Sequence, residues 1–319
     1  MRTMTIDASH GDTTSTHTLR LPFEPPLDFP LILGFLAKRA IPGIERVTPT
    51  TYERVFGPAE NPAWLRVSAD PAKPELILDI VNADAKEFAV VVERTRRIFD
   101  LDADLRPVHA LFSRSPVLKA GIERRPGLRV PGCWDGFELA VRAVIGQQVS
   151  VASATTVTRR LVDRYGPPRI RAPLELDRVF PEPALLADAA LDDIGLPKTR
   201  VETLRTLARA MLMGGVDFTP GQDLREFVTN LTRLRGIGPW TANYIAMRAL
   251  RHPDAFPAGD VVLQQVLGGE RRLSERETEA VSQQWRPWRA YSVLHLWYLW
   301  SDFARAGSVG IKGERVSVK

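Results

Sequence analysis

Hydrophobic and polar positions follow two different patterns along the chain, and the change falls near residue 131. Before it, apolar residues alternate with polar ones over residues 18–23, 63–68 and 75–82, which predicts strands. Residues 30–41 and 84–99 instead have apolar positions at helical spacing. Strands and two helices within about ninety residues predict a small α+β domain.

Almost every segment after residue 131 has the spacing of a helix. Breaks containing Pro or Gly divide these segments, so the connections are short. Short helices with short connections predict an orthogonal α bundle and not a coiled coil or solenoid. The predicted fold class is therefore mostly α with an N-terminal α+β domain. The breaks lie at residues 166–168, 195–197, 214–215 and 253–257.

These patterns divide the chain into five parts. Two polar tails enclose an α+β domain and two helical domains, one of which is assembled from two separate stretches. Both tails lack apolar periodicity, and we expect them to be poorly ordered. The predicted boundaries are 1–17 for the first tail, 18–110 for the α+β domain, 111–135 with 253–303 for one helical domain, 136–252 for the other, and 304–319 for the last tail.

The composition excludes several classes of protein. Hydrophobic residues make up 44% and charged residues 25% of the 319 residues, as in soluble globular proteins. No apolar run approaches the roughly 20 residues that span a bilayer. The first residues lack the apolar core of a signal peptide, so we expect a cytoplasmic protein. The single cysteine, Cys133, and five scattered histidines argue against a disulfide framework and a zinc or iron–sulfur centre.

The most informative segment is residues 223–250, DLREFVTNLTRLRGIGPWTANYIAMRAL. An amphipathic run with Phe227 and Leu231 on one face ends at a Gly-Ile-Gly-Pro sequence, and a second helical run follows it. Two helices joined by such a turn form a helix–hairpin–helix. The alternative is that Gly-x-Gly-Pro is only a tight connection between two packed helices.

The turn between the two helices is suited to holding an anion. Gly236 and Gly238 are expected to allow backbone torsions closed to other residues and a close approach of phosphate. Pro239 suits the first turn of the second helix, because its missing N–H costs nothing there. The free N–H groups of that helix then face an anion, which grips a DNA backbone without reading its sequence.

The net charge of +5 is a mild basic excess, which is a weak indication of a polyanionic partner. Paired arginines could line a DNA face, although such charges are more often a solvated surface. Together they would make DNA binding depend steeply on salt. The pairs are Arg124 with Arg125, Arg233 with Arg235, and Arg271 with Arg272.

Asp260 is the candidate acid. It follows a Pro/Gly loop, precedes an apolar helical run and lies 20 positions after Trp240, so we expect it at the start of a helix. One interpretation is a plain helix-capping aspartate, which is favoured at such positions. The other is a functional carboxylate beside the hairpin.

Three blocks of this chain resemble the helix–hairpin–helix DNA glycosylase superfamily, and within it the alkylation-inducible bacterial 3-methyladenine DNA glycosylase II family. The resemblance runs from about residue 18 to residue 301. It implies an N-terminal domain like the TATA-binding protein and two helical domains that flank a cleft. It also implies base excision repair of double-stranded DNA in a bacterium, by a monomer. The blocks are RPGLRVPGCWDGFELAVRAVIGQQVSVA, GIGPWTANYIAMRAL and WRPWRAYSVLHLWY.

The resemblance gives Asp260 the catalytic position. Cleavage of a glycosidic bond passes through an oxocarbenium-like sugar, which a neighbouring anion stabilises. Asp260 would supply that anion and could also orient or deprotonate the attacking water. Bifunctional members carry a lysine directly after the hairpin, where Trp240 stands here. Because an indole is not nucleophilic, hydrolysis without strand cleavage is expected.

Trp240, Tyr244 and Trp297 are the predicted base pocket. Trp240 and Tyr244 are four positions apart and face the same way on a helix, and the resemblance adds Trp297. Electron-rich rings attract a cationic alkylated base by roughly 0.5–2 kcal/mol. The other aromatic residues of this region are expected to pack in the core, as aromatics at helical spacing usually do. These are Trp285, Trp288 and Trp300.

The segment Gly146-Gln147-Gln148-Val149-Ser150 carries the predicted wedge. A flipped nucleotide leaves a gap in the base stack, and the resemblance places Gln148 in that gap, with Gln147 beside it at the DNA. Relatives carry leucine at the wedge position, so a polar glutamine makes the insertion energy uncertain. The alternative is a solvated loop between two helices.

The resemblance also implies a monovalent cation, Na⁺ or K⁺, on main-chain carbonyls of Thr232, Leu234 and Gly236. Neutral carbonyl oxygens suit a hard cation, and no organic cofactor is required. The DNA-contacting residues would be Gln147 and Gln148 with the hairpin residues Gly236, Ile237, Gly238, Pro239 and Trp240.

The resulting hypothesis is a monofunctional glycosylase that releases alkylated bases, chiefly 3-methyladenine-type purines, from duplex DNA. Two alternatives remain at this point. A bifunctional glycosylase/lyase would need an amine at position 240 and commonly a four-cysteine cluster, and both are absent. A non-catalytic helix–hairpin–helix module would bind DNA without cutting it, but such a module gains nothing from an anion at Asp260.

Overall fold

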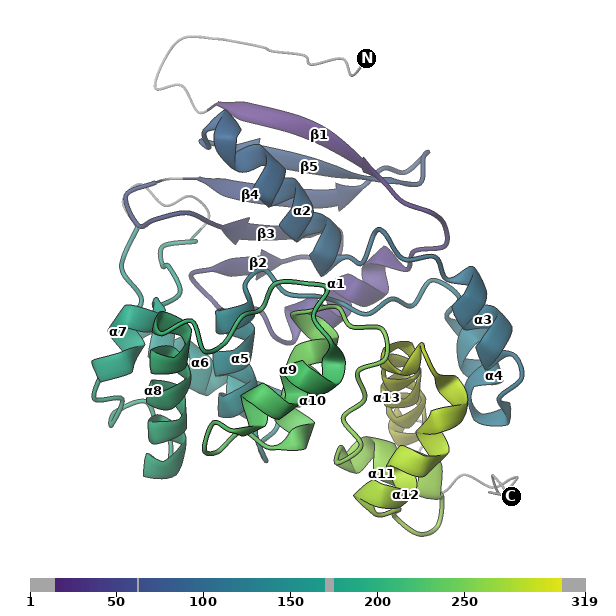
Figure 1. Ribbon diagram of the computed structural model, residues 1–319. Coiled ribbons are helices and arrows are strands. Elements are labelled where there is room, and N and C mark those ends of the chain that lie inside the picture. The colour runs from purple at the N-terminus through teal and green to yellow at the C-terminus, as the bar shows by residue number, and fades with distance from the viewer. Residues whose placement is uncertain (1–14, 62, 170–174, 306–319) are drawn as a thin grey trace.

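A five-stranded antiparallel sheet forms the N-terminal part of the protein (Figure 1). The structure is a computed structural model that describes residues 15–61, 63–169 and 175–305. The alternation of buried and exposed positions along the strands places Leu76, Leu78 and Ile80 in the core. The strands, in the order β1-β5-β4-β3-β2, are β1 (Thr16–Pro22), β2 (Glu45–Val47), β3 (Thr51–Val55), β4 (Trp64–Ala69) and β5 (Glu75–Val81).

Two helices accompany the sheet. The helix α2 (Phe88–Ile98) lies across one face of the sheet and buries Val91 and Ile98, and a short 3-10 turn (Ala85–Glu87) precedes it. The helix α1 (Phe29–Ala37) lies between the sheet and the helical part of the chain (Figure 1). It begins at Asp28, whose carboxylate accepts the Leu31 N–H at 2.9 Å.

The structure corrects several predicted boundaries in this domain. The predicted strands at 18–23, 63–68 and 75–82 are present, but β1 begins at Thr16, so the predicted tail over 1–17 is too long; residues 1–14 lie outside the described residues. The helix predicted over 30–41 ends at Ala37, and the chain continues in tighter turns in which the Arg39 and Ala40 N–H groups donate to Leu36 O and Ala37 O.

The strands β2 and β3 were not predicted from the sequence. These strands are three and five residues long and are rich in charge, so they lack the apolar alternation that marks a strand. In β3, Glu53 and Arg54 are almost completely buried. Their charges are compensated by partners from other elements, which a local pattern does not reveal.

The rest of the described chain is helical, as predicted. None of its helices is long and apolar enough within the described residues to cross a membrane. They are α3 (Arg106–Phe112), α4 (Pro116–Arg124), α5 (Gly136–Ile145), α6 (Val151–Tyr165), α7 (Pro183–Asp188), α8 (Lys198–Leu212), α9 (Leu224–Thr232), α10 (Pro239–Arg248), α11 (Val261–Gly268), α12 (Glu275–Ser282), a 3-10 turn (Gln283–Trp285) and α13 (Arg289–Arg305).

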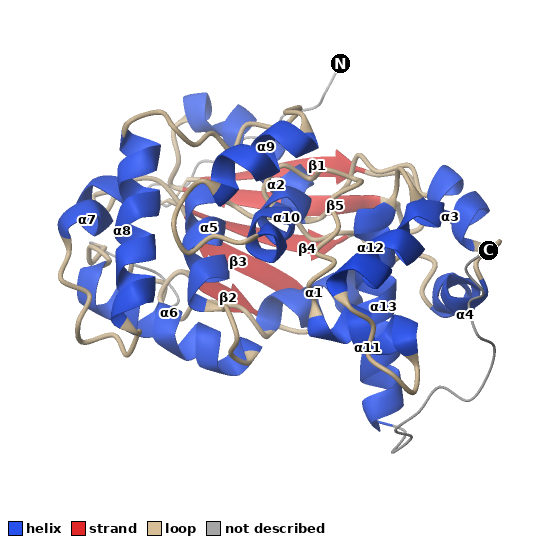
Figure 2. Ribbon diagram, turned by 60° about the horizontal axis from the view of Figure 1, so that its bottom comes forward, coloured by secondary structure: helices blue, strands red, loops and turns tan. Residues whose placement is uncertain are grey.

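The helices lie in two groups, with α10 between them (Figure 2). The helices α5 to α8 lie on one side of α10, and α11, α12 and α13 lie on the other, while α9 packs against α10 itself. Although α4 is distant in sequence from α13, the two pack together: Arg125, just after α4, donates to Asp302 at 2.7 Å, and the Trp285 indole donates to Ser115 at 3.2 Å.

A buried cluster of four charges joins the sheet to the helices. Arg54 of β3 forms ion pairs with Glu45 and with Glu138 of α5, and Arg142 pairs with Glu138 at 3.1 Å and with Glu45 at 3.5 Å. Two guanidinium groups and two carboxylates balance, which a buried cluster requires. The cluster holds the residues that follow α1 against α5, and this contact positions one wall of the site described next.

Candidate active site

The hairpin between α9 and α10 has the predicted form, and Gly236 explains its sharp turn. Gly236 has φ +91°, and a Cβ atom there would lie 2.0 Å from Thr203 Oγ1. Only glycine fits this position. Pro239 occupies the first turn of α10, as predicted.

Two expectations about the hairpin are wrong. Gly238 was expected to need a backbone torsion closed to other residues, but its φ of −92° is one that any residue adopts. Apart from its own chain neighbours, no atom of the described residues lies within 4 Å of the place where a Cβ atom would stand, so Gly238 leaves open space there. Ile237 is 4% exposed and its N–H donates to Leu234 O at 3.0 Å, so it has no free donor for a phosphate. Among the described residues, the N–H groups of Gly238 and Trp240 bond to no main-chain carbonyl, so these two can face an anion.

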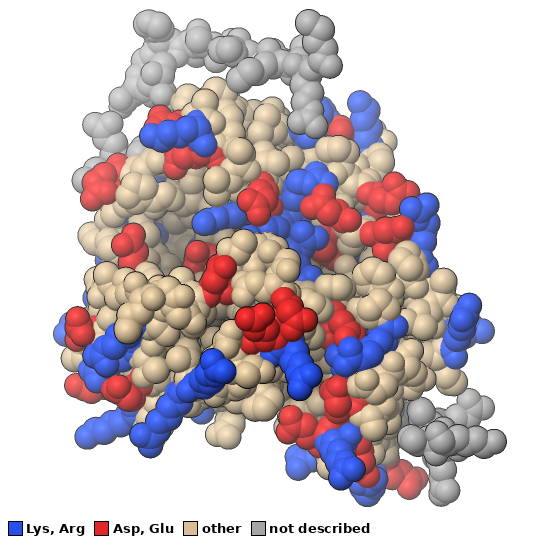
Figure 3. Space-filling view, in the orientation of Figure 1, with Lys and Arg blue, Asp and Glu red and all other residues tan. Residues whose placement is uncertain are grey.

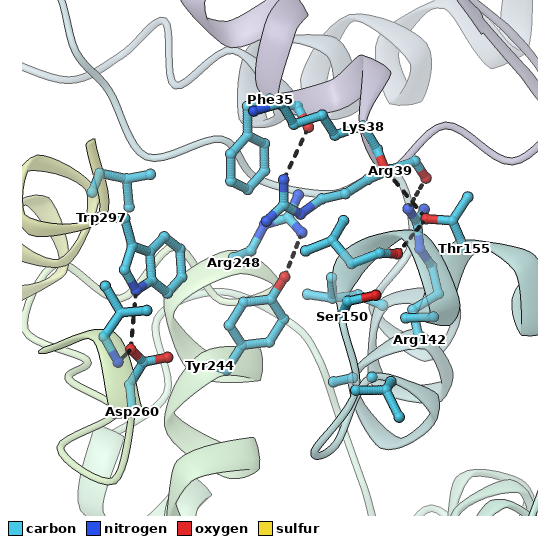
Figure 4. Close-up of a pocket in the computed structure, with 18 of the residues that line it drawn as sticks. Phe35, Lys38, Arg39, Arg142, Ser150, Thr155, Tyr244, Arg248, Asp260 and Trp297 are labelled. Carbon is cyan, nitrogen blue, oxygen red and sulfur yellow. Dashed lines mark hydrogen bonds between the residues drawn. The ribbon is translucent and has the colours of Figure 1, made fainter. Parts of the chain in front are cut away.

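Asp260 caps α11, as one interpretation expected, and its side chain also lines an open pocket beside the hairpin. Its Oδ1 atom accepts the N–H groups of Val262 and Leu263, each at 3.0 Å. The loop before it turns the chain so that the carboxylate lines a hollow of about 490 Å³ (Figure 4).

The same hollow, here called the base pocket, brings the three aromatic residues predicted for it together with Asp260, the predicted catalytic acid. Trp240 and Tyr244 come from α10, Trp297 from α13, and Asp260 from the start of α11. The rings of Trp240 and Tyr244 stack at 5.6 Å with an angle of 10°, and the Tyr244 and Trp297 rings lie 6.4 Å apart. The pocket therefore has an aromatic wall with a carboxylate at one end.

Both tryptophans of the pocket contact the carboxylate. Trp240 Nε1 donates to Asp260 Oδ2 at 3.3 Å, and Trp297 Nε1 donates to Asp260 Oδ1 at 3.3 Å (Figure 4 shows the second bond). With the two backbone groups, four N–H groups point at one carboxylate. This arrangement stabilises negative charge at the mouth of the pocket.

The other tryptophans fit the packing prediction in two cases out of three. Trp285 is 1% exposed in the core, and Trp288 is half-buried against Tyr291. Trp300 contradicts the prediction, because it is 38% exposed and lines the base pocket. It lies in the last two turns of α13.

Arginines that the sequence analysis missed form the opposite end of the base pocket. Arg248 lies one helical turn after Tyr244, and its Nη1 donates to the Tyr244 hydroxyl at 3.0 Å (Figure 4). Arg39 follows α1, and Arg142 donates to the Arg39 carbonyl. The four-residue spacing of Tyr244 and Arg248 was the one signal that could have revealed this contact.

The N-terminal domain supplies part of this wall. Phe35, Lys38 and Arg39 all line the base pocket, and the Arg248 guanidinium lies 5.0 Å from the centre of the Phe35 ring. No local pattern in the sequence joins α1 to α10, which is about 200 positions later. The sheet domain therefore takes part in the site instead of only supporting it.

The basic wall changes the titration of the tyrosine. Burial alone would raise the pKa of Tyr244, but the neighbouring charges of Arg248, Arg39 and Arg142 outweigh it and lower that pKa to about 8. Burial lowers the pKa of Arg39, which lies beside Tyr244 and Arg248. The pocket is thus negative at Asp260 and positive at its far end.

The turn between α5 and α6 borders the base pocket. Gln147 Nε2 donates to Gly236 O at 2.9 Å and to Thr241 Oγ1 at 3.0 Å, so this side chain ties the turn to the hairpin. Gln148 is exposed at the tip with φ +58° and does not line the base pocket. Its neighbour Val149 does, and is 42% exposed.

A second hollow of about 820 Å³, here called the α8 groove, lies at the same turn and is lined by Gln148. It runs along the beginning of α8 to the first residues of the hairpin. Its lining consists of Gln147, Gln148, Asp192, Lys198, Thr199, Arg200, Val201, Glu202, Thr203, Arg205, Thr206, Arg235 and Gly236.

The predicted arginine pairs differ in their surroundings. Arg124 and Arg125 both pair with Asp302, and Arg271 pairs with Glu277, so these residues act as ordinary surface charges. Arg233 and Arg235 are exposed at the hairpin. Only this last pair lies beside the residues predicted to bind phosphate.

The carbonyl groups predicted to hold a cation are available for it. Leu234 O accepts one N–H, from Ile237, and Gly236 O accepts one, from Gln147. A carbonyl oxygen has two lone pairs, so each retains one. Neutral carbonyl oxygens of this kind suit a hard monovalent cation, and the cation at these residues stays a prediction. Among the described residues, no group of three or more His, Cys, Asp or Glu side chains could hold a metal ion.

Comparison with known proteins gives consistent matches. Residues 18–135 match the family described as AlkA N-terminal domain, and residues 141–290 match the HhH-GPD superfamily base excision DNA repair proteins. The chain is 35% identical to DNA-3-methyladenine glycosylase 2 of Escherichia coli, over 87% of this chain and 96% of that protein.

Two further similarities concern a longer protein and a solved structure. A probable bifunctional transcriptional activator/DNA repair enzyme of Mycobacterium tuberculosis is 37% identical over 88% of this chain, and the chain spans 57% of its length. The solved structure of a 3-methyladenine DNA-glycosylase from Archaeoglobus fulgidus matches with a TM-score of 0.75 at 20% identity, over 91% of this chain and 100% of that one. This likeness extends the agreement to the fold.

Proposed function

This chain belongs to the HhH-GPD superfamily of base excision DNA repair proteins, and from that premise we propose that it hydrolyses the N-glycosidic bond of alkylated bases flipped out of duplex DNA. One observation carries the proposal: the Asp260 carboxylate faces the base pocket with both indole N–H groups bound to it, next to the hairpin. The relatives named 3-methyladenine glycosylases support alkylated purines as the substrate class.

Asp260 acts on the sugar. As the bond to the base breaks, positive charge develops on the sugar, and a carboxylate beside it lowers the energy of that state. An alkylated purine already carries positive charge and leaves as a neutral base, so a second acid is unnecessary. Because Oδ1 accepts three N–H groups and Oδ2 only one, Oδ2 is the atom that can still orient a water molecule.

Trp240 makes the reaction hydrolytic. It stands where a lyase would carry its amine, and its indole nitrogen donates a hydrogen bond instead of attacking the sugar. No Schiff base forms and the strand is left intact. The product is an abasic site whose flanking phosphodiester bonds are both intact.

The two ends of the base pocket suit two kinds of damaged base. The aromatic wall attracts cationic alkylpurines. Arg39 and Arg248 at the far end would repel a positive charge but donate to carbonyl or ring-nitrogen acceptors on a neutral base. We therefore include neutral bases with an acceptor edge, such as hypoxanthine, in the proposed spectrum.

The hairpin and the neighbouring turn hold the DNA. The N–H groups of Gly238 and Trp240 face the phosphate beside the flipped nucleotide. Carbonyl groups of Thr232, Leu234 and Gly236 would hold a monovalent cation, which supplies positive charge against that phosphate when bound. Gln148 at the tip of the turn is proposed to fill the gap in the stack, with the exposed Val149 beside it.

Incubation with methylated duplex DNA, followed by assay of free base and of strand nicking, tests the proposal. Free base without nicking is the expected result. Base release with nicking would make the protein a lyase, and tight binding without either reaction would make it a DNA-binding module. The two outcomes correspond to the alternatives left open by the sequence.

The variant Asp260→Asn sharpens the test. It should lower base release by about 1000-fold while DNA affinity stays equal or rises, because a carboxylate facing phosphates is removed. Asp223→Asn is the matched control, since Asp223 caps α9 in the same way but lies outside the base pocket. Retained turnover in Asp260→Asn would contradict the assignment.

A further inference from the structure

The α8 groove continues the predicted DNA surface past the turn between α5 and α6. That turn has the base pocket on one side, lined by Gly146, Val149 and Ser150, and the α8 groove on the other, lined by Gln147 and Gln148. The groove also reaches Arg235 and Gly236 of the hairpin. A duplex seated on the hairpin would therefore meet the groove as well as the pocket.

Uncompensated positive charge follows the groove. Lys198, Arg200 and Arg235 make no ion pair within the described part of the chain. Further along α8, by contrast, Arg205 donates to the carbonyls of Ala189 and Ala190. Blue side chains gather at the lower left of Figure 3, over α8, with acidic ones among them.

The acidic groups of the groove do not cancel this charge. They are Asp192 and Glu202, and Glu202 already lies 3.6 Å from Arg205 and 3.8 Å from Arg209. Four basic side chains, Lys198, Arg200, Arg205 and Arg235, face these two carboxylates. Positive charge in excess along an open groove fits the phosphates of a nucleic acid.

The lining shows which part of a nucleic acid fits. It contains no aromatic side chain, unlike the base pocket, so it offers no surface for stacking a base. It offers hydroxyl groups instead, from Thr199 and Thr206, and the exposed amide of Gln148. Hydroxyl, amide and basic groups are the usual partners of phosphate oxygens and sugars, which carry no sequence information.

The helix α10 lies between Asp260 and α8. Asp260 begins α11 on one side of α10, whereas α8 lies on the other side (Figure 2). The damaged strand must pass on the Asp260 side, because its sugar has to reach that carboxylate. The complementary strand then lies across the turn, toward α8.

We propose that the α8 groove holds the backbone of the undamaged strand opposite the flipped nucleotide, through Lys198 and Arg200. This inference rests on the proposed function and adds a second contact surface to it. It makes duplex structure, and not only the lesion, a requirement for efficient base release. The protein should thus favour a lesion in duplex DNA over the same lesion in a single strand.

The test compares kcat/KM for one lesion in duplex and in single-stranded DNA, using the full chain. In the double variant Lys198→Gln/Arg200→Gln, the duplex-to-single-strand ratio should fall on the order of tenfold. The slope of log Kd against log salt for duplex should become less steep by about 2, one for each lost phosphate contact. The matched control is Arg114→Gln/Lys119→Gln, two exposed residues at α4, far from α8.

Two outcomes overturn the inference, and a third separates it from the proposed function. Equal losses on both substrates would assign the groove to the damaged strand. An unchanged ratio and salt slope would show that the groove holds no DNA. If the unaltered protein released no base from either substrate, the proposed function would fail. The groove would then be tested by measuring Kd for undamaged duplex and for undamaged single strands. The double variant should lower the ratio of duplex affinity to single-strand affinity on the order of tenfold.

Discussion

At the scale of single residues, Asp260 shows how one side chain serves two purposes. Its Oδ1 atom caps α11 by accepting the N–H groups of Val262 and Leu263, and its Oδ2 atom accepts the indole N–H of Trp240 in the base pocket. The two indole groups fix the plane of the carboxylate, because each donates to a different oxygen. We infer that the tryptophans position the acid as well as stack on the base.

Trp297→Phe tests this positioning role. The phenyl ring keeps an aromatic surface but loses the N–H donor, so kcat should fall about tenfold, as expected for the loss of one hydrogen bond to a charged group. KM should change much less. Trp288→Phe, outside the base pocket, is the control and should leave both constants unaltered. A fall in kcat of the control of similar size would point to a general packing defect.

Tyr244 makes the pocket sensitive to alkaline pH. Its pKa of about 8 lies below the ordinary value of 10.0, so the folded protein loses this proton first. Its contribution to stability is therefore complete above pH 10 and is lost as the pH falls through 8. A phenolate in the pocket should also raise release of cationic bases relative to neutral hypoxanthine above pH 8.

Titration of tyrosinate absorbance checks this expectation. The native protein should show one group with a midpoint near pH 8, and Tyr244→Phe should abolish it. Tyr52 provides an internal comparison, because burial and the neighbouring Glu45 raise its pKa well above the usual value. If the signal near pH 8 persisted in Tyr244→Phe, another tyrosine would be its source.

At the scale of elements, the hairpin depends on two glycines for different reasons. Gly236 needs its left-handed backbone and the absence of a Cβ atom against Thr203, while Gly238 needs neither. Gly238 instead leaves open space in front of the N-terminus of α10. A substitution of Gly236 should therefore affect the stability of the fold, whereas a substitution of Gly238 should affect DNA binding.

Alanine substitutions test this separation. Gly236→Ala should destabilise the protein by about 2–4 kcal/mol, because the methyl group meets Thr203 in a strained backbone. Gly238→Ala should fold with nearly unchanged stability yet bind duplex DNA more weakly, because a methyl group obstructs the phosphate. Urea unfolding and DNA-binding titrations measure the two effects. Equal stability losses in both variants would contradict this division.

The elements that could be predicted from the sequence are those with a strong local pattern. The hairpin, the helix start at Asp260 and the strand β5 all carry their signal within a dozen residues. The strands β2 and β3 could not be predicted, because their buried charged residues are balanced by cross-strand partners such as Glu45 and by Glu138 of α5, which apolar alternation does not reveal. The end of α1 could not be predicted from the apolar pattern, because Ala40 and Ile41 continue that pattern beyond Ala37.

At the scale of the whole molecule, the base pocket is a joint product of the sheet domain and the helices. The helical spacing of Trp240 and Tyr244 predicted that they face the same way, and the family resemblance singled out Asp260. Arg39 could not be predicted, because only the tertiary fold brings α1 to α10. Arg142 links the two parts by donating to the Arg39 carbonyl while pairing with Glu138. The wall of the pocket therefore depends on the buried ionic cluster.

Glu138→Ala tests that dependence. It leaves Arg54 buried without one of its carboxylates, so the free energy of unfolding should fall by about 3–5 kcal/mol. Asp163→Ala, which removes the exposed pair with Arg159 on α6, should change it by less than about 1 kcal/mol. Chemical denaturation measures both. A loss below about 1 kcal/mol in Glu138→Ala would show that the cluster contributes little.

The side chain of Gln147 has a consequence for how the protein searches a genome. Because the Gln147 amide joins the turn proposed to carry the wedge to the hairpin, we expect the two to engage DNA as a unit. A protein built this way would inspect DNA in discrete stops, releasing and rebinding between them, instead of tracking smoothly along a groove. The length of duplex inspected per encounter would then shorten sharply as salt rises.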